Sequence, residues 1–189
     1  VPGMAVTFAL FLMGFVAAAY FREKEWKTWE RLRSTPTSPP QLVAGKLIVP
    51  FALCVTQSIV LFAVGIAFLD LRIDGALWQL PLVTLAFGAA LMCGGLLLAA
   101  VCRSIGELNA VASVGALLLA ALGGAIVPVS TLPAAVQDVT PFVPTYWAVD
   151  GYQRVICGSG GSILAPCAEL FALAVALAAI AIVRLRSSS

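Results

Sequence analysis

Long apolar runs alternate with short polar segments along the whole chain. Five runs consist almost entirely of apolar residues, and they cover residues 3–21, 47–69, 80–102, 109–127 and 164–183. Each run approaches the length of about 20 residues with which a helix crosses the hydrocarbon core of a bilayer. The pattern predicts an all-α integral membrane protein in which residues 1–189 form a single domain with five transmembrane helices.

Composition supports a lipid environment and excludes several classes of function. The chain has 189 residues, of which 61% are hydrophobic and only 11% charged, and its mean hydropathy is +1.04. A soluble domain of this length could not bury so much apolar surface in one core. The sequence contains no histidine, which excludes histidine-based catalysis and most zinc sites. No cluster indicates a nucleophile or a metal site, and the clustered charges do not suggest nucleic acid as a partner.

The distribution of lysine and arginine predicts an orientation. Spans that cross the membrane in turn place nine basic residues on one side and only two, Arg72 and Arg154, on the other. The side richer in basic residues is normally cytoplasmic, so the carboxy terminus is expected in the cytoplasm and the amino terminus outside. Because the chain begins with Val1, we expect an upstream span, which would give six helices with both termini inside. The nine residues are Arg22, Lys24, Lys27, Arg31, Arg33, Lys46, Arg103, Arg184 and Arg186.

The most strongly charged segment, residues 22–34, separates the first two spans and reads REKEWKTWERLRS. Trp26, Trp29 and Leu32 are three apart and would share one face of a helix. The prolines that follow end this helix, because proline lacks a backbone donor and restricts its predecessor. A basic amphipathic helix lying on anionic headgroups and a docking helix for a cytoplasmic protein both fit these residues.

The segment 129–165 is long, mostly uncharged and interrupted by prolines and glycines. It is too broken to span, and its aromatic residues Tyr146, Trp147 and Tyr152 predict short amphipathic or re-entrant helices at the outer interface. Asp150 and Arg154 are four apart and can pair on one such helix. This segment is either an interfacial anchor or an outer gate whose candidate residues are Pro144, Trp147, Asp150 and Arg154. Nearby, Cys157 and Cys167 allow either a disulfide or two free thiols.

Residues of the charged segment and its flanks resemble the permease family of type-2 ATP-binding-cassette (ABC-2) transporters, which includes drug and polysaccharide exporters. The family pattern contains Pro-Gly, a span, Arg-Glu, a Gly-Thr-x-Glu-Arg-Leu element, a Thr-Pro or Ser-Pro turn and Leu-x-x-Gly-Lys. Lys27 departs from it, since the family usually has glycine there. The matching residues are Pro2, Gly3, Arg22, Glu23, Thr28, Glu30, Arg31, Leu32, Thr35, Pro36, Leu42, Gly45 and Lys46.

The resemblance implies a permease that dimerises and sits on ATP-binding cassette subunits, which bind the ATP and magnesium. It implies that residues 22–34 form the coupling helix, with Arg22, Glu23, Trp26, Thr28, Trp29, Glu30, Arg31 and Leu32 as ATPase-coupling residues. Thr35, Pro36, Gly45 and Lys46 would form a coupling turn. It also implies export of a hydrophobic or amphipathic substrate, of the drug, lipid or glycan class, across a bacterial cytoplasmic membrane.

The sequence itself has no phosphate-binding loop, because Gly45-Lys46 is followed by Leu47 and lacks the required upstream glycine. No ATPase activity or bound cofactor is therefore expected of this chain. An ATP-independent secondary transporter or channel is the alternative, although matched charged or broken spans are not evident. An intramembrane enzyme would need polar chemistry inside the spans, and the sequence offers little of it.

Overall fold

The structure is a computed structural model that describes residues 2–25, 39–158 and 162–187. These residues form helices and connecting loops and contain no strand. The long helices are α1 (Pro2–Glu25), α3 (Pro39–Phe68), α4 (Gln79–Val101), α5 (Ile105–Leu122), α7 (Pro144–Cys157) and α8 (Leu164–Ser187). Between α5 and α7 lie two 3-10 turns, Val129–Thr131 and Thr140–Phe142, and the four-residue helix α6 (Ala134–Gln137).

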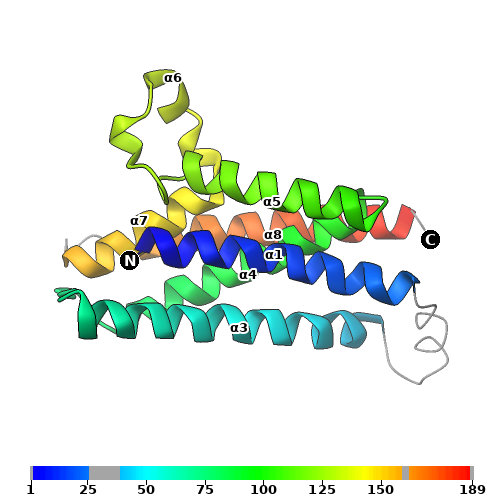
Figure 1. Cartoon of the computed structure of the whole chain (residues 1–189), viewed down its shortest axis with the longest axis horizontal. Coiled ribbons are helices and arrows are strands. Elements are labelled where there is room, and N and C mark those ends of the chain that lie inside the picture. Colours follow the sequence, from blue (N-terminus) through cyan, green and yellow to red (C-terminus); the bar gives the residue numbers. More distant parts are fainter. Residues whose placement is uncertain (1, 26–38, 159–161, 188–189) are drawn as a thin grey trace.

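Five of the described helices are long and apolar enough to cross a membrane, namely α1, α3, α4, α5 and α8. They run side by side, and the two ends of the chain lie at opposite ends of the bundle (Figure 1). This confirms the prediction of an all-helical membrane protein with five spans in this chain. The end where α1 stops and α3 starts is called the α1/α3 end below, and the opposite end, which carries α7, is called the α7 end.

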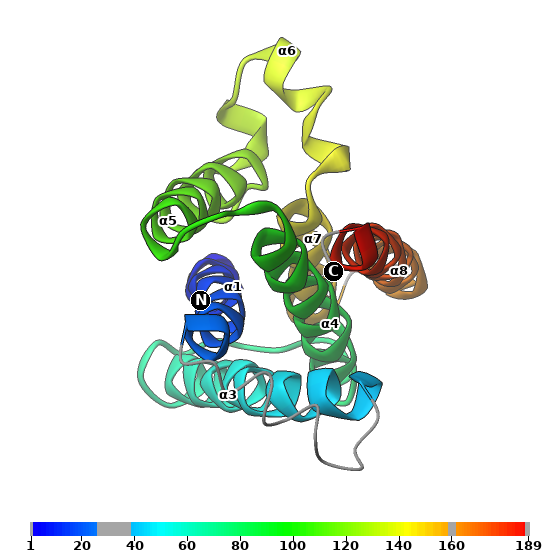
Figure 2. The same ribbon diagram turned by 90° about the vertical axis from the view of Figure 1, so that its right-hand side faces the viewer.

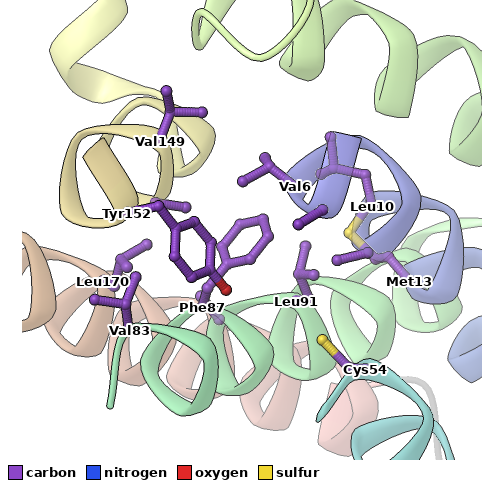
Figure 3. Close-up of a cluster of buried hydrophobic side chains, with 14 of the residues drawn as sticks. Val6, Leu10, Met13, Cys54, Val83, Phe87, Leu91, Val149, Tyr152 and Leu170 are labelled. Carbon is purple, nitrogen blue, oxygen red and sulfur yellow. The ribbon is translucent and has the colours of Figure 1, made fainter. Parts of the chain in front are cut away.

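Helix α4 is the centre of the bundle. It packs against α8, α1, α3 and α7, and the view along the bundle shows the other helices arranged around it (Figure 2). The largest buried cluster gathers side chains from these elements, including Leu10 of α1, Phe87 of α4 and Tyr152 of α7 (Figure 3). Large apolar side chains on the outer faces of α3, α5 and α8 are exposed, as expected where hydrocarbon is the solvent.

The fourth span differs from its predicted range. Residues 109–127 were expected, whereas α5 covers Ile105–Leu122. It begins earlier because the Ser104 side chain accepts a hydrogen bond from the Glu107 amide at 3.1 Å, while Glu107 Oε2 accepts one from the Arg103 amide at 2.8 Å. These reciprocal bonds resemble a capping box and bring polar residues into the first turn.

The same helix also ends five residues before the predicted limit. Gly124 adopts φ +79°, a left-handed conformation that glycine tolerates far better than other residues. The Ala125 amide then donates to the Ala120 carbonyl at 2.9 Å, which is the bond that closes a Schellman-type helix end. The apolar run from Ala125 to Val127 therefore lies beyond the helix although its composition suits a span.

Candidate functional site

The charged connection at the α1/α3 end begins inside a helix. Arg22 and Glu23 lie in the last turn of α1, which continues without a break to Glu25. The predicted boundary at residue 22 is therefore wrong, whereas a coupling helix in the rest of 22–34 stays a prediction, because residues 26–38 lie outside the described ranges. Residues 19–25 contain neither glycine nor proline, so nothing stops the first span from extending past its apolar part. The candidates that lie outside the described residues are Trp26, Thr28, Trp29, Glu30, Arg31, Leu32, Thr35 and Pro36.

On the other side of this connection, α3 begins at Pro39. Proline suits the first turn of a helix, where an amide hydrogen has no intrahelical acceptor. Gly45 and Lys46 lie in the second turn of α3, so they belong to a helix and not to the turn in which they were placed. A Cβ added to Gly45 would meet no atom within 4 Å, so packing among the described residues gives no reason for a glycine there.

At the α7 end, the segment predicted to be interfacial contains one well-packed helix. Figures 1 and 2 show α6 standing away from the bundle, whereas α7 lies against α4 and α8. Along α7, the buried residues Ala148, Val149, Tyr152 and Val155 recur at spacings of one, three and three residues. This spacing places them on one face of the helix, and it explains why a 14-residue helix is held in place without spanning.

The four candidate gate residues all belong to α7 but make different contacts. Arg154 Nε lies 2.8 Å from Asp150 Oδ2, so the predicted ion pair forms. Arg154 also donates to the Ser162 carbonyl at 3.2 Å, which connects α7 to the residues preceding α8. Trp147 donates from Nε1 to the Pro141 carbonyl at 2.8 Å, and Pro144 opens the helix. The hydrogen bonds of Trp147 and Arg154 thus connect the two halves of α7 to different neighbouring segments.

Tyr152 is the residue whose role the sequence did not reveal. It was grouped with interfacial aromatic residues, but it is only 1% exposed. Its hydroxyl lies 2.8 Å from Thr84 Oγ1 of α4, and its ring centroid lies 5.1 Å from that of Phe62 of α3. Burial raises the pKa of Tyr152 to about 12, so the hydroxyl stays protonated and can donate. Three helices therefore meet at this side chain.

The loop between α3 and α4 holds the far end of α7. The amides of Asp74 and Gly75 donate to the carbonyls of Ile156 and Val155, each at 3.0 Å. Gly75 lies so close to the Val155 carbonyl that a Cβ would overlap it, and Gly158 ends the helix with φ +58°. The last carbonyls of α7, which a helix leaves unbonded, are thereby satisfied by another segment.

Two hollows of equal volume lie between spanning helices. One of about 420 Å³ lies between α1 and α5 and is lined by Phe11, Phe15, Asn109 and Ser113 among others. Another of about 420 Å³ lies between α3 and α4 and is almost wholly apolar, with Ser58 and Thr84 at its wall. Both hydroxyls already donate to carbonyls of their own helices. Of these two hollows, the one between α1 and α5 is therefore the one in which polar side chains, Asn109 and Ser113, have no hydrogen-bond partner among the described residues.

The remaining chemistry of the described residues is sparse. All five cysteines, Cys157 and Cys167 included, are free thiols, so the possible disulfide does not form in this structure. Within the described ranges, no group of three or more acidic, cysteine or histidine side chains could hold a metal ion. Two features therefore stand out: the charged connection between α1 and α3 at one end of the bundle, and the short helix α7 packed against α4 and α8 at the other.

Comparison with known proteins agrees with this architecture. Neither the curated proteins nor the solved structures include a match to this chain. A family model described as "ABC-2 family transporter protein" matches residues 1–183. Permeases of this kind lack ATPase activity themselves and pair with ABC ATPase subunits. The match extends over nearly the whole chain, which therefore belongs to the ABC-2 family as a multi-pass membrane component of a transporter.

Proposed function

We propose that this chain is the membrane subunit of an ATP-driven exporter that moves a hydrophobic or amphipathic substrate, of the drug, lipid or glycan class, outward. A separate ABC ATPase would bind ATP and magnesium and drive the cycle. The observation that carries the proposal is the charged connection between α1 and α3. Because α1 extends to Glu25 and α3 starts at Pro39, only 13 residues lie between two long spanning helices. A force applied to residues 26–38 would be delivered to both.

Helix α3 is suited to carry such a displacement across the membrane. Its 30 residues correspond to a length of about 45 Å, which reaches from the α1/α3 end to the α7 end. Near its far end, Phe62 packs against Tyr152 of α7. A shift of α3 along its axis would therefore reach the re-entrant helix by direct contact. Residues Pro144, Trp147, Asp150 and Arg154 are proposed to act there as a gate, because they determine how α7 is held.

The proposed orientation places the α1/α3 end in the cytoplasm of a bacterial inner membrane. The excess of lysine and arginine at that end supports it, and the ATPase partner needs cytoplasmic ATP. A second copy of the permease is proposed to cover the hollow between α1 and α5. Asn109 and Ser113 are exposed there within a spanning helix, where polar side chains normally face protein or a water-filled cavity and not lipid.

The coupling mechanism is tested by replacing Glu30 and Arg31 together with alanine. Permease and partner ATPase are reconstituted in liposomes, and ATP-driven movement of a fluorescent amphipathic dye and of a fluorescent phospholipid is measured. The variant is expected to lose at least about nine-tenths of ATP-driven transport, because a coupling step needs both contact and force transfer. Arg72→Ala with Asp74→Ala removes a similar pair of charges from the α7 end and should retain transport.

Two results would contradict the mechanism. Unchanged ATP-driven transport by the Glu30→Ala, Arg31→Ala variant would show that this connection does not couple hydrolysis to movement. Transport by the wild-type permease alone, without ATP and without an ATPase subunit, would favour the secondary transporter instead. Co-purification of the ATPase with the variant shows whether the loss lies in assembly or in coupling.

A further inference from the structure

A cleft at the α7 end brings two of the proposed gate residues, Pro144 and Trp147, together with residues that the export mechanism does not use. It lies between α8 and the segment that leads into α7, and its volume is about 280 Å³. The aromatic side chains of Phe142 and Trp147 line one side, and Glu169 and Leu173 of α8 line the other. The cleft therefore places one carboxylate opposite two aromatic rings at the edge of a spanning helix.

Glu169 is the charged side chain of this cleft, and it is exposed there. It is the one charged residue in the apolar span Leu164–Ala181, and within the described ranges no hydrogen bond or ion pair engages it. It is the sixth residue of α8, beyond the first turn in which the helix dipole favours an anion. Arg154 is already engaged by Asp150 and by the Ser162 carbonyl. An ionisable group in a span normally faces a functional partner.

The other acidic residue in a described span shows the contrast. Glu107 of α5 accepts a hydrogen bond from the Arg103 amide at 2.8 Å and so caps its own helix. Helix capping alone therefore explains why a carboxylate lies at the start of α5. Nothing comparable holds Glu169, which leaves its charge available to a molecule that enters the cleft.

The aromatic wall restricts the kind of molecule. Trp147 donates its only polar hydrogen to the Pro141 carbonyl, so its indole can offer a ligand only its ring. Phe142 is 83% exposed although it is large and apolar. Aromatic rings attract an organic cation through their negative faces, and tryptophan does so most strongly. A carboxylate opposite such rings complements a positive charge that is surrounded by carbon.

We propose that this cleft binds the alkylammonium group of an amphipathic molecule. Glu169 neutralises the charge, and Trp147 and Phe142 contact the methyl or methylene groups around the nitrogen. A volume of about 280 Å³ lies just below the range for pockets that hold drug-sized ligands, so the cleft suits a headgroup and not a whole drug-sized molecule. The cleft shares Pro144 and Trp147 with the gate of the proposed function, but binding requires neither ATP nor the ATPase subunit and is therefore measured separately from export.

The proposal is tested by equilibrium binding to the purified full chain in nanodiscs of phosphatidylglycerol, a lipid without an ammonium group. Radiolabelled benzyltrimethylammonium is the probe. Saturable binding is expected, and Glu169→Gln should weaken it about tenfold or more, because a charged contact is lost. Trp147→Leu should weaken it about threefold by removing the cation–ring attraction. Glu107→Gln, a matched loss of a carboxylate from a span, should leave the affinity unchanged.

A measurement on the wild-type chain alone keeps the test independent of variant folding. The uncharged carbon analogue of the probe, in which carbon replaces nitrogen, is expected to compete at least tenfold less well than the cation. Equal competition by that analogue, equal affinity in Glu169→Gln, or absence of saturable binding would each overturn the proposal. Nanodiscs that contain phosphatidylethanolamine distinguish the natural source. Reduced probe affinity there assigns the site to lipid headgroups, and unchanged affinity assigns it to soluble amphipathic cations.

Discussion

Helices α4 and α5 have a similar pattern of residues but occupy different positions in the bundle. Both are apolar and carry small residues every four positions, Ala86, Ala90 and Gly94 in one and Ala112, Ala116 and Ala120 in the other. Nevertheless, 56% of the α4 span is buried and only 22% of the α5 span. Helix α4 packs against four long helices, whereas α5 packs chiefly against α1. A stripe of small residues therefore identifies a packing face but not how many faces are covered.

The difference in burial indicates that the two helices have different structural roles. Small residues in lipid allow close helix contact, and in α4 they serve several neighbours at once: Gly88 lies near Phe51 and Cys54, and Gly95 near Met13 and Val16. In α5 the buried alanines occupy one side, while Val114, Leu117 and Leu118 on the other are exposed. We conclude that α4 is the structural axis of the bundle and that α5 has a surface free for lipid or another chain.

The largest expected effect comes from adding bulk at the centre. A Cβ at Gly95 would lie 2.8 Å from the Met13 carbonyl oxygen and 2.8 Å from Val16 Cβ, and a helix backbone cannot easily move away. Gly95→Val is therefore expected to destabilise the fold by about 3 kcal/mol or more. The measurements are the yield of monodisperse protein after size-exclusion chromatography in detergent and the melting temperature of what is recovered.

The matched control is the same substitution in the peripheral helix. A Cβ at Gly115 of α5 would meet nothing within 4 Å, so Gly115→Val should leave both yield and melting temperature nearly unchanged. If Gly115→Val were as damaging as Gly95→Val, the face of α5 around Gly115 would have to pack against something other than the described residues of this chain. If both were harmless, the close approach of α1 to α4 would be wrong.

A smaller but more specific effect is expected from the exposed side of α5. Were a second copy to cover the α1/α5 hollow, Ser113→Cys would bring two introduced thiols near one another across a two-fold axis. A short bifunctional thiol reagent applied to native membranes should then convert a substantial share of the chain to dimer, above the background from the five native cysteines. Val60→Cys, on an exposed face of α3, is the control and should give only the background. Equal cross-linking of the two variants would exclude this face as the interface.

Helices α4 and α5 also differ in how well the sequence predicted their ends. Spans are determined by length and hydropathy, so the run 80–102 predicted α4 to within one residue at each end. The ends of α5 are determined by caps, in which Ser104, Glu107 and Gly124 outweigh hydropathy. The charged residues Arg22 and Glu23 extend α1, because helix continuation depends on the absence of breakers and not on polarity.

Side-chain partners were harder to predict than spans. The Asp150–Arg154 pair could be predicted because four-residue spacing within one helix fixes proximity. The contact between Thr84 and Tyr152 joins residues 68 apart, so it depends on how α7 folds back onto α4. The cleft at Glu169 likewise needs the turn at Phe142 and helix α8 to be placed together. Sequence spacing carries no information on such pairs, although an isolated threonine within an apolar span was a signal that a polar partner exists.

The smallest expected effect concerns the contact that joins α7 to α4 at the centre of the bundle. Tyr152→Phe removes the hydroxyl bonded to Thr84 but keeps the ring against Phe62, so the loss should be about 0.6 kcal/mol, the average for such bonds in membrane helices. A double-mutant cycle with Thr84→Val, followed by unfolding in mixed detergent micelles, isolates this coupling from the bond that Thr84 makes to the Leu80 carbonyl. Tyr146→Phe, which also removes one hydroxyl from α7, serves as the control and should show no coupling to Thr84→Val. A coupling energy near zero for Tyr152 would mean that the bond to Thr84 does not help to hold α7 against α4, and that their contact depends on apolar packing.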